Sequence, residues 1–124
     1  MGANGSFEKD STAHESGRRW MTIAELSDGT KVLELKAKGG AIKLPEESHT
    51  PNSVYAIFNK DGSGVKSIAK YGNDGKKLYE IHTTDHKGMG IHVHYWKDGK
   101  PLNEEPHLLT PAMKKLLINI SDLK

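Results

Sequence analysis

Four strand-like runs follow one another in the middle of the chain, and in the last two of them apolar residues alternate with polar ones. Alternation with a period of two places successive side chains on opposite faces of a β-strand. Short segments rich in glycine and aspartate separate the stretches, and connections of this length join only antiparallel neighbours. The pattern therefore predicts an antiparallel β-meander of four or more strands, formed by Val54–Asn59, Val65–Tyr71, Lys77–Thr83 and Gly90–Trp96.

A β-hairpin is predicted ahead of this meander. The runs Trp20–Leu26 and Lys31–Ala37 flank Asp28-Gly29. Asp-Gly between apolar runs is a strong hairpin signal, because both central residues of a tight hairpin turn must tolerate positive φ. A two-residue turn would pair Ala24 with Leu33 and Thr22 with Leu35.

The other segments before residue 54 carry weaker patterns. Residues 1–17 contain one aromatic residue and no periodicity, so they are predicted to be a flexible leader before a single domain of residues 18–124. Ala41–Leu44 is a short candidate strand. A helix over Arg18–Leu26 competes with the first strand of the hairpin, because its apolar residues also have helical spacing, but the hairpin is favoured.

A helix is predicted near the C-terminal end of the sequence. Thr110 can cap it, and Pro111 suits the first helical position, where no amide donor is needed. The apolar residues that follow recur at i, i+3, i+4 and i+7, so they form one stripe that is expected to pack on the apolar side of the sheet. The stripe consists of Met113, Leu116, Leu117 and Ile120. Strands and helix together predict an α+β fold.

Length and composition limit the classes to which the chain can belong. Its 124 residues, 35% of them hydrophobic, suffice for one domain with a modest core. The formal net charge of +2 is too balanced for indiscriminate binding to nucleic acid, which would require a local basic patch. The sequence contains no cysteine, which excludes disulfides and thiolate metal sites. No apolar run approaches the roughly 18 residues of a membrane span, and an export signal would lie outside this sequence.

Histidines are concentrated in Tyr79–Trp96, which contains four of the seven in the chain. Strand alternation allows Ile81 to oppose Val93, directly or with a two-residue shift, on an apolar face. The polar side chains of the two strands then share the other face, with opposed Cβ atoms about 5 Å apart. This face is predicted to hold Glu80, His82, His92, His94 and Trp96, with Asp85 and His86 in the turn at its end.

General acid–base catalysis on a phosphodiester is the first interpretation of this face. Histidine suits it because an unperturbed pKa of about 6.5 leaves both forms populated at neutral pH. A neutral imidazole would take the 2′-hydroxyl proton of RNA, and an imidazolium would protonate the departing 5′-oxygen. Lysines would hold the phosphate charge, and an aromatic ring can stack a base. The candidates are Lys66, Lys70 and Lys87 for phosphate and Trp96 for stacking.

Metal binding is a second interpretation of the same residues. His92 and His94 offer two imidazoles to one ion, with His82, Asp85 or His86 as a further ligand. The spacing of a cupin, a His-Asn-His nuclease or a His-Glu-x-x-His helix is not found. A third interpretation is a solvated face without chemistry, against which stands the crowding of four histidines into thirteen positions.

The same part of the sequence resembles a known family. Tyr71-Gly-Asn-Asp-Gly75, Ile81-His-Thr-Thr-Asp-His86 and His92-Val-His94 are similar in order and spacing to a pattern of C-terminal toxin domains from bacterial polymorphic and contact-dependent inhibition systems. The resemblance covers residues 54–96. It implies functional roles for Asp85, His86, His92 and His94.

Two positions depart from the family pattern. His82 stands where an aspartate is frequent, and Gly90-Ile91 stands where a proline often precedes the first histidine of the last motif. These departures concern the role of His82 and the shape of the loop.

The resemblance also implies a biological setting. Such domains are commonly nucleases, often acting on tRNA, and many have a small sheet with flanking helices of the barnase-like, EndoU or colicin type. They are delivered as part of a larger secreted or cell-surface effector and act in the cytoplasm of the target cell. A cognate immunity protein neutralises them in the producer, and elongation factor Tu is a candidate partner.

The leading hypothesis is an antibacterial ribonuclease toxin that cleaves tRNA without a metal or other cofactor. Its catalytic candidates are His82, Asp85, His86, His92 and His94. The alternatives are a metal-dependent nuclease that uses the histidines as ligands, and a non-enzymatic binding or immunity module.

Overall fold

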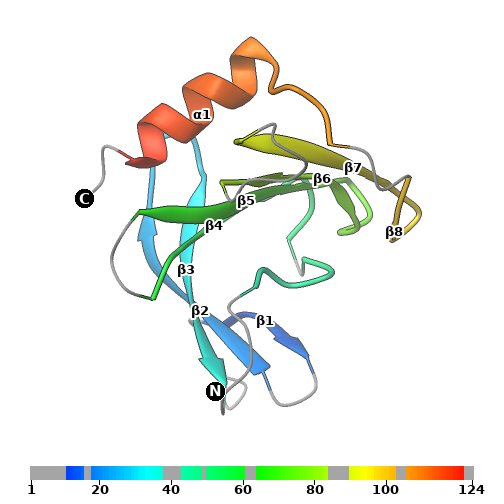
Figure 1. Cartoon of the computed structure of the whole chain (residues 1–124). Helices are drawn as coiled ribbons and strands as arrows, with labels where there is room; N and C mark the ends of the chain where they lie inside the picture. The colour runs from blue at the N-terminus through cyan, green and yellow to red at the C-terminus, as the bar shows by residue number, and fades with distance from the viewer. Residues whose placement is uncertain are drawn as a thin grey trace.

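The computed structural model describes residues 11–15, 18–37, 43–48, 50–60, 64–83, 90–102 and 106–121. Within these ranges the chain forms one sheet of eight strands in sequence order and one helix, as Figure 1 shows. The α+β class is therefore confirmed. The elements are β1 (Ser11–Glu15), β2 (Arg18–Glu25), β3 (Lys31–Ala37), β4 (Val54–Phe58), β5 (Val65–Tyr71), β6 (Lys77–His82), β7 (His92–Lys97), β8 (Lys100–Pro101) and α1 (Pro111–Ser121).

The predicted meander is confirmed in β4 to β7, which pair successively with one another in antiparallel orientation. Each observed strand begins and ends within two residues of the bounds expected from the sequence. The pairing of β3 with β4 is parallel, which the sequence did not indicate. Parallel neighbours need a long connection, and the chain between Ala37 and Val54 is long enough to return to the start of the next strand.

The N-terminal hairpin is confirmed, and it excludes the competing helix, but its predicted register is wrong. Thr22 pairs with Leu33, and the register shifts between Thr22 and Ala24. The amide of Leu26 donates to the carbonyl of Thr30 at 2.8 Å, so the turn contains three residues instead of two. Gly29 has a φ of 93°, as the left-handed residue of such a turn requires. A longer turn and a β-bulge together move the pairing by two residues.

Two further segments differ from expectation. Ser11–Glu15, assigned to the flexible leader, form β1 and pair with β2. Its residues do not alternate in polarity, and the pairing uses the backbone, so the sequence pattern did not reveal the strand. Of the candidate strand Ala41–Leu44, the described residues Lys43 and Leu44 are not in a strand, and Leu44 is instead buried in the core. The first two residues of that candidate lie outside the described ranges.

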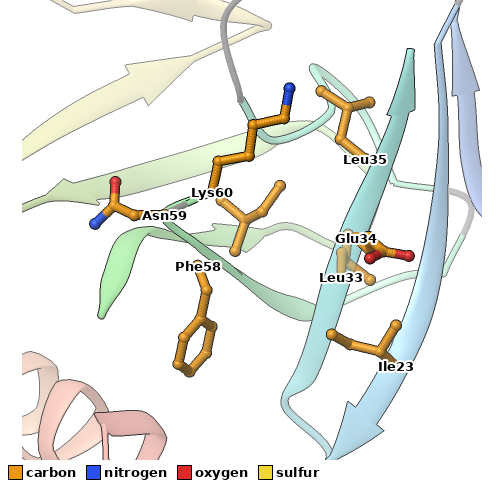
Figure 2. A pocket seen from close by; sticks show the side chains of 8 residues that line it. Ile23, Leu33, Glu34, Leu35, Phe58, Asn59 and Lys60 are labelled. Carbon is orange, nitrogen blue, oxygen red and sulfur yellow. The ribbon is translucent and has the colours of Figure 1, made fainter. Parts of the chain in front are cut away.

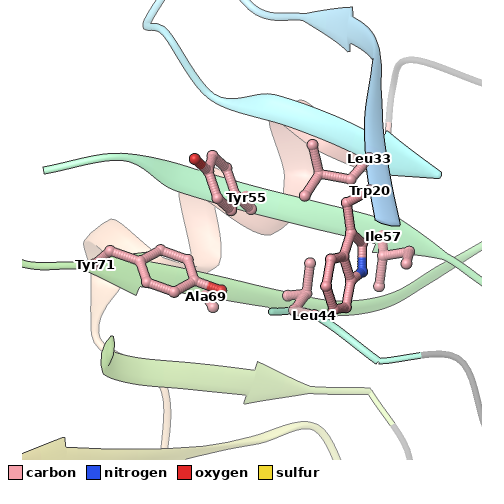
Figure 3. Close-up of a cluster of buried hydrophobic side chains, with 7 residues drawn as sticks. All are labelled: Trp20, Leu33, Leu44, Tyr55, Ile57, Ala69 and Tyr71. Carbon is pink, nitrogen blue, oxygen red and sulfur yellow. The ribbon is translucent and has the colours of Figure 1, made fainter. Parts of the chain in front are cut away.

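Apolar residues occur at both odd and even positions of β4 and β5, so apolar side chains point to both faces of the central sheet. Other parts of the chain cover both faces. One face carries a first core, drawn in Figure 3. Residues 43–48 cross this face, and α1 lies on the other (Figure 1). The first core consists of Trp20, Leu33, Leu44, Tyr55, Ile57, Ala69 and Tyr71.

Hydrogen bonds of buried aromatic side chains attach residues 43–48 to the first core. The indole of Trp20 donates to the carbonyl of Lys43 at 2.8 Å, and the hydroxyl of Tyr71 donates to the carbonyl of Pro45 at 2.6 Å. The hydroxyl of Tyr55 hydrogen-bonds that of Ser48 at 2.6 Å. These bonds satisfy polar groups that burial would otherwise leave unpaired at a cost of about 1–3 kcal/mol each.

The helix has the predicted cap and packs with the predicted face. The amide of Met113 donates to the Thr110 hydroxyl at 3.2 Å, which is an N-cap bond. Met113 and Ile120 are buried in a second core, which also contains buried residues of the strands. Leu116 and Leu117 pack against this second core. No helix among the described residues has the length and apolar character needed to cross a membrane.

Gly75 should be less tolerant of substitution than Gly29. Both have positive φ, but a Cβ at Gly75 would lie 2.5 Å from the carbonyl oxygen of Ser48, whereas a Cβ at Gly29 meets nothing within 4 Å. We expect Gly29→Ala to cost about 1 kcal/mol of unfolding free energy from backbone strain, and Gly75→Ala to cost about 1–3 kcal/mol more. Urea denaturation measures both, and equal losses would contradict the close approach.

Candidate functional site

The pairing of β6 with β7 places the histidines. Ile81 pairs directly with Val93, as one of the two predicted registers requires, and both side chains are completely buried. Glu80 consequently pairs with His94, and His82 pairs with His92. The predicted shared face of the hairpin is therefore confirmed. We refer to Glu80, His82, His92 and His94 as the histidine face.

The apolar backing of this hairpin extends across four strands. Opposed residues of neighbouring strands point to the same side of a sheet. Ala56, Ile68, Ile81 and Val93 form one such row, in which every side chain is fully buried. The row belongs to the second core beneath α1. Burial of this row holds the register, because a one-residue slip would bring the histidines into the core.

Three imidazoles converge on the histidine face. The ring centroids of His92 and His94 are 4.9 Å apart, and that of His82 lies 5.3 Å from His94 and 5.4 Å from His92. One ring nitrogen from each residue lies within 4.8 Å of the other two. His92 is buried with 1% of its surface exposed, whereas 37% of the His82 side chain is exposed. The cluster thus runs from the sheet interior to solvent.

Hydrogen bonds determine the tautomers of two of these rings. Nδ1 of His92 lies 2.8 Å from the carbonyl oxygen of Gly90, which can only accept, so Nδ1 carries the hydrogen. Nε2 of His82 lies 3.2 Å from Oε2 of Glu80, and the carboxylate makes Nε2 the donor. In the neutral rings the lone pairs therefore lie on Nε2 of His92 and Nδ1 of His82.

A buried ion pair supports the carboxylate of Glu80. Nζ of Lys77 lies 2.8 Å from Oε1, with the Lys77 side chain 3% and the Glu80 side chain 10% exposed. Burial by itself would raise the pKa of Glu80, but the hydrogen bond from His82 and the charge of Lys77 outweigh it and lower this pKa below its ordinary value. Glu80 is therefore an anion that bridges Lys77 and His82.

Sequence reasoning missed the role of Lys77. Residues 77 and 80 have opposite parity, so a regular strand would place them on opposite faces. The register of β5 and β6 shifts between the pairs Lys70–Tyr79 and Tyr71–Lys77. This bulge reverses the parity and brings Lys77 to the histidine face. Nζ of Lys77 also lies 4.3 Å from the ring centroid of Trp96.

The other predicted site residues differ in where they lie relative to the histidine face. Trp96 is half-buried, lies on β7 with the parity of His92 and His94, and contacts Lys77. Lys70 pairs with Tyr79, so it belongs to the opposite side of the sheet from the histidines. Lys66 lies at a bulge, where Ile57 pairs with Ser67 and Phe58 with Val65, and strand alternation is interrupted. Asp85, His86 and Lys87 lie outside the described residues.

His107 lies beside the hairpin but is separate from the histidine face. The backbone of His107 bridges that of Val93, and its exposed ring lies 5.4 Å from the ring centroid of Tyr95. Tyr95 packs against the second core, on the other side of β7 from His94. His107 is therefore a matched control for substitutions in the cluster.

Two hollows of the described surface lie away from the histidine face. One of about 230 Å³ lies between β2, β3 and the end of β4, where Figure 2 shows Phe58 and Lys60 on one side and Ile23, Leu33 and Leu35 on the other. The other, of about 420 Å³, is lined by Ile91, Leu108, Leu109, Lys114, Leu117 and Ile118. Neither is lined by a residue of the histidine face. The histidine face is therefore separate from both hollows.

Comparisons with protein-family models, with curated proteins and with solved structures found no match.

The Lys77–Glu80 pair should be strongly coupled. We expect Glu80→Gln to cost about 3 kcal/mol of unfolding free energy, because it leaves the buried ammonium of Lys77 without a counter-charge. The double variant Lys77→Met/Glu80→Gln should lose less than the sum of the two single variants. Urea denaturation of all four proteins measures this coupling.

An exposed ion pair provides the control. Glu34 and Lys36 are 2.8 Å apart with about half of each side chain exposed. Glu34→Gln should therefore change the unfolding free energy by less than about 1 kcal/mol. Additive losses in the Lys77–Glu80 cycle would show that the buried pair does not act as a unit.

Proposed function

We propose that this domain is an antibacterial toxin that cleaves RNA at the histidine face. The observation that carries the proposal is the convergence of three imidazoles, with one nitrogen of each within 4.8 Å of the others. Such a set supplies both a proton acceptor and a proton donor within reach of one phosphodiester. Titratable groups gathered in this way are more common at sites of chemistry than on inert surfaces.

The proposed reaction is cleavage by the neighbouring 2′-hydroxyl. A neutral imidazole removes the 2′-proton, the 2′-oxygen attacks phosphorus, and the 5′-oxygen leaves with a proton from an imidazolium. The products are a 2′,3′-cyclic phosphate and a free 5′-hydroxyl. His82 and His92 suit these steps because hydrogen bonds to Glu80 and Gly90 orient their rings. Asp85, His86 and His94 are the other proposed participants.

Phosphate binding is assigned to fewer lysines than the sequence suggested. Lys70 belongs to the other side of the sheet and is not included. Lys77 is on the correct side, but its charge is compensated by Glu80 at 2.8 Å. Lys66 and Lys87 remain the candidates for phosphate. Trp96 remains the candidate for base stacking, with one of its contacts already made by Lys77.

The biological part of the proposal rests on the family resemblance. We propose tRNA as the substrate, delivery within a larger effector, and action in the cytoplasm of a target cell. A cognate immunity protein and elongation factor Tu are the proposed partners.

Cleavage should depend on the cluster histidines. We expect His92→Ala and His94→Ala to lower the cleavage rate by at least about 100-fold each, which is the usual contribution of a positioned acid or base. His107→Ala should cleave like the wild type, because its ring lies on the other side of β7. The assay follows purified tRNA on denaturing gels, with circular dichroism to confirm that each variant is folded.

Expression in bacteria separates the alternatives. The wild-type domain should arrest growth and the His94→Ala variant should not, with total RNA showing the loss of intact tRNA. Normal growth with intact RNA would favour a binding or immunity module instead. Persistence of cleavage in EDTA, with a 2′,3′-cyclic phosphate on the product, is expected. Loss of cleavage in EDTA would favour the metal-dependent alternative.

A further inference from the structure

The three imidazoles also have the arrangement of a metal site. We propose that His82, His92 and His94 bind one divalent transition-metal ion of the Zn²⁺ class. This binding goes beyond the proposed cleavage of RNA.

The three ring nitrogens lie near enough to one another to converge on one ion. Zn²⁺ binds imidazole nitrogens at about 2.0–2.1 Å, which places two ligand nitrogens about 3.3 Å apart. One nitrogen of each of the three residues is already within 4.8 Å of the other two. Binding of one ion would require rotations of the rings that bring these nitrogens up to about 1.5 Å closer together. His82 has room for such a rotation, since 37% of its side chain is exposed.

The outer hydrogen bonds are those that metal-binding histidines use. A histidine ligand almost always donates its second ring N–H to a carboxylate or a backbone carbonyl, which directs the remaining lone pair at the ion. His82 has the carboxylate of Glu80 at 3.2 Å, and His92 has the carbonyl of Gly90 at 2.8 Å. Both kinds of partner are thus present before any ion binds.

The ligand set selects the class of metal. Three imidazoles suit Zn²⁺ and its neighbours in the first transition series, whereas Mg²⁺ and Ca²⁺ prefer oxygen. Glu80 is engaged with Lys77 at 2.8 Å, so we assign it to the outer shell. Three protein ligands leave a coordination position for water or a phosphate oxygen.

Metal binding and proton transfer compete, because both use the lone pair of a histidine ring nitrogen. A lone pair that coordinates Zn²⁺ does not accept a proton, so a bound ion should slow acid–base cleavage of RNA. This consequence rests on the proposed function, whereas metal binding itself does not.

Calorimetric titration of the full chain with ZnCl₂, after treatment with a chelator and in the absence of RNA, tests the site. We expect one ion per chain for the wild type and for His107→Ala. His82→Ala and His94→Ala should bind at least about 100-fold more weakly, and Glu80→Gln about 10- to 100-fold more weakly. MgCl₂ should give no comparable binding. His82 and His94 are partly exposed, so their variants should fold, as circular dichroism can confirm.

The outcomes separate this inference from the proposed function. Unchanged Zn²⁺ affinity in folded His82→Ala and His94→Ala would overturn the metal site, even if RNA cleavage persisted. Binding with the expected variant pattern, but without cleavage in either metal state, would uphold the site and remove the ribonuclease proposal. Cleavage that requires added Zn²⁺ would uphold the site and overturn the expected inhibition.

Discussion

The direct pairing of Ile81 with Val93 is the contact on which the arrangement of the site depends. Both side chains are fully buried in a row that crosses four strands and lies beneath α1. Side chains alternate along a strand, so burial of this row turns the intervening residues to the other side. A shift by one residue would exchange the two sets and place imidazoles in an apolar core, which is costly unless they find hydrogen bonds.

The histidine face continues the side of the sheet that holds the first core. Tyr55 and Ala69 of that core are in register with Glu80 and His94. Along this row the character changes from apolar at β4 to polar at β7, which lies near one end of the sheet. The polar cluster therefore has a rigid apolar neighbour on one side and solvent on the other. Such graded burial holds one part of the cluster against the sheet and leaves another part open to solvent.

One set of hydrogen bonds underlies both chemical proposals. The carboxylate of Glu80 and the carbonyl of Gly90 each receive a ring N–H, so they determine where the lone pairs of His82 and His92 lie. A directed lone pair is what a general base needs and equally what a metal ligand needs. The hydrogen bond from His82 and the charge of Lys77 together offset the cost of burying the carboxylate of Glu80 and lower its pKa.

Local periodicity by itself determined a large part of this protein. The strands of the meander, the capped helix and the shared face of the histidines all follow from the spacing of apolar residues, which is a local property. Tertiary structure decided β1, the parallel pairing of β3 with β4, the register of the first hairpin and the sides taken by Lys70 and Lys77. These features arise from β-bulges and from contacts between distant segments. A bulge adds a single residue and reverses the parity of all that follows, and sequence alternation does not reveal where it occurs.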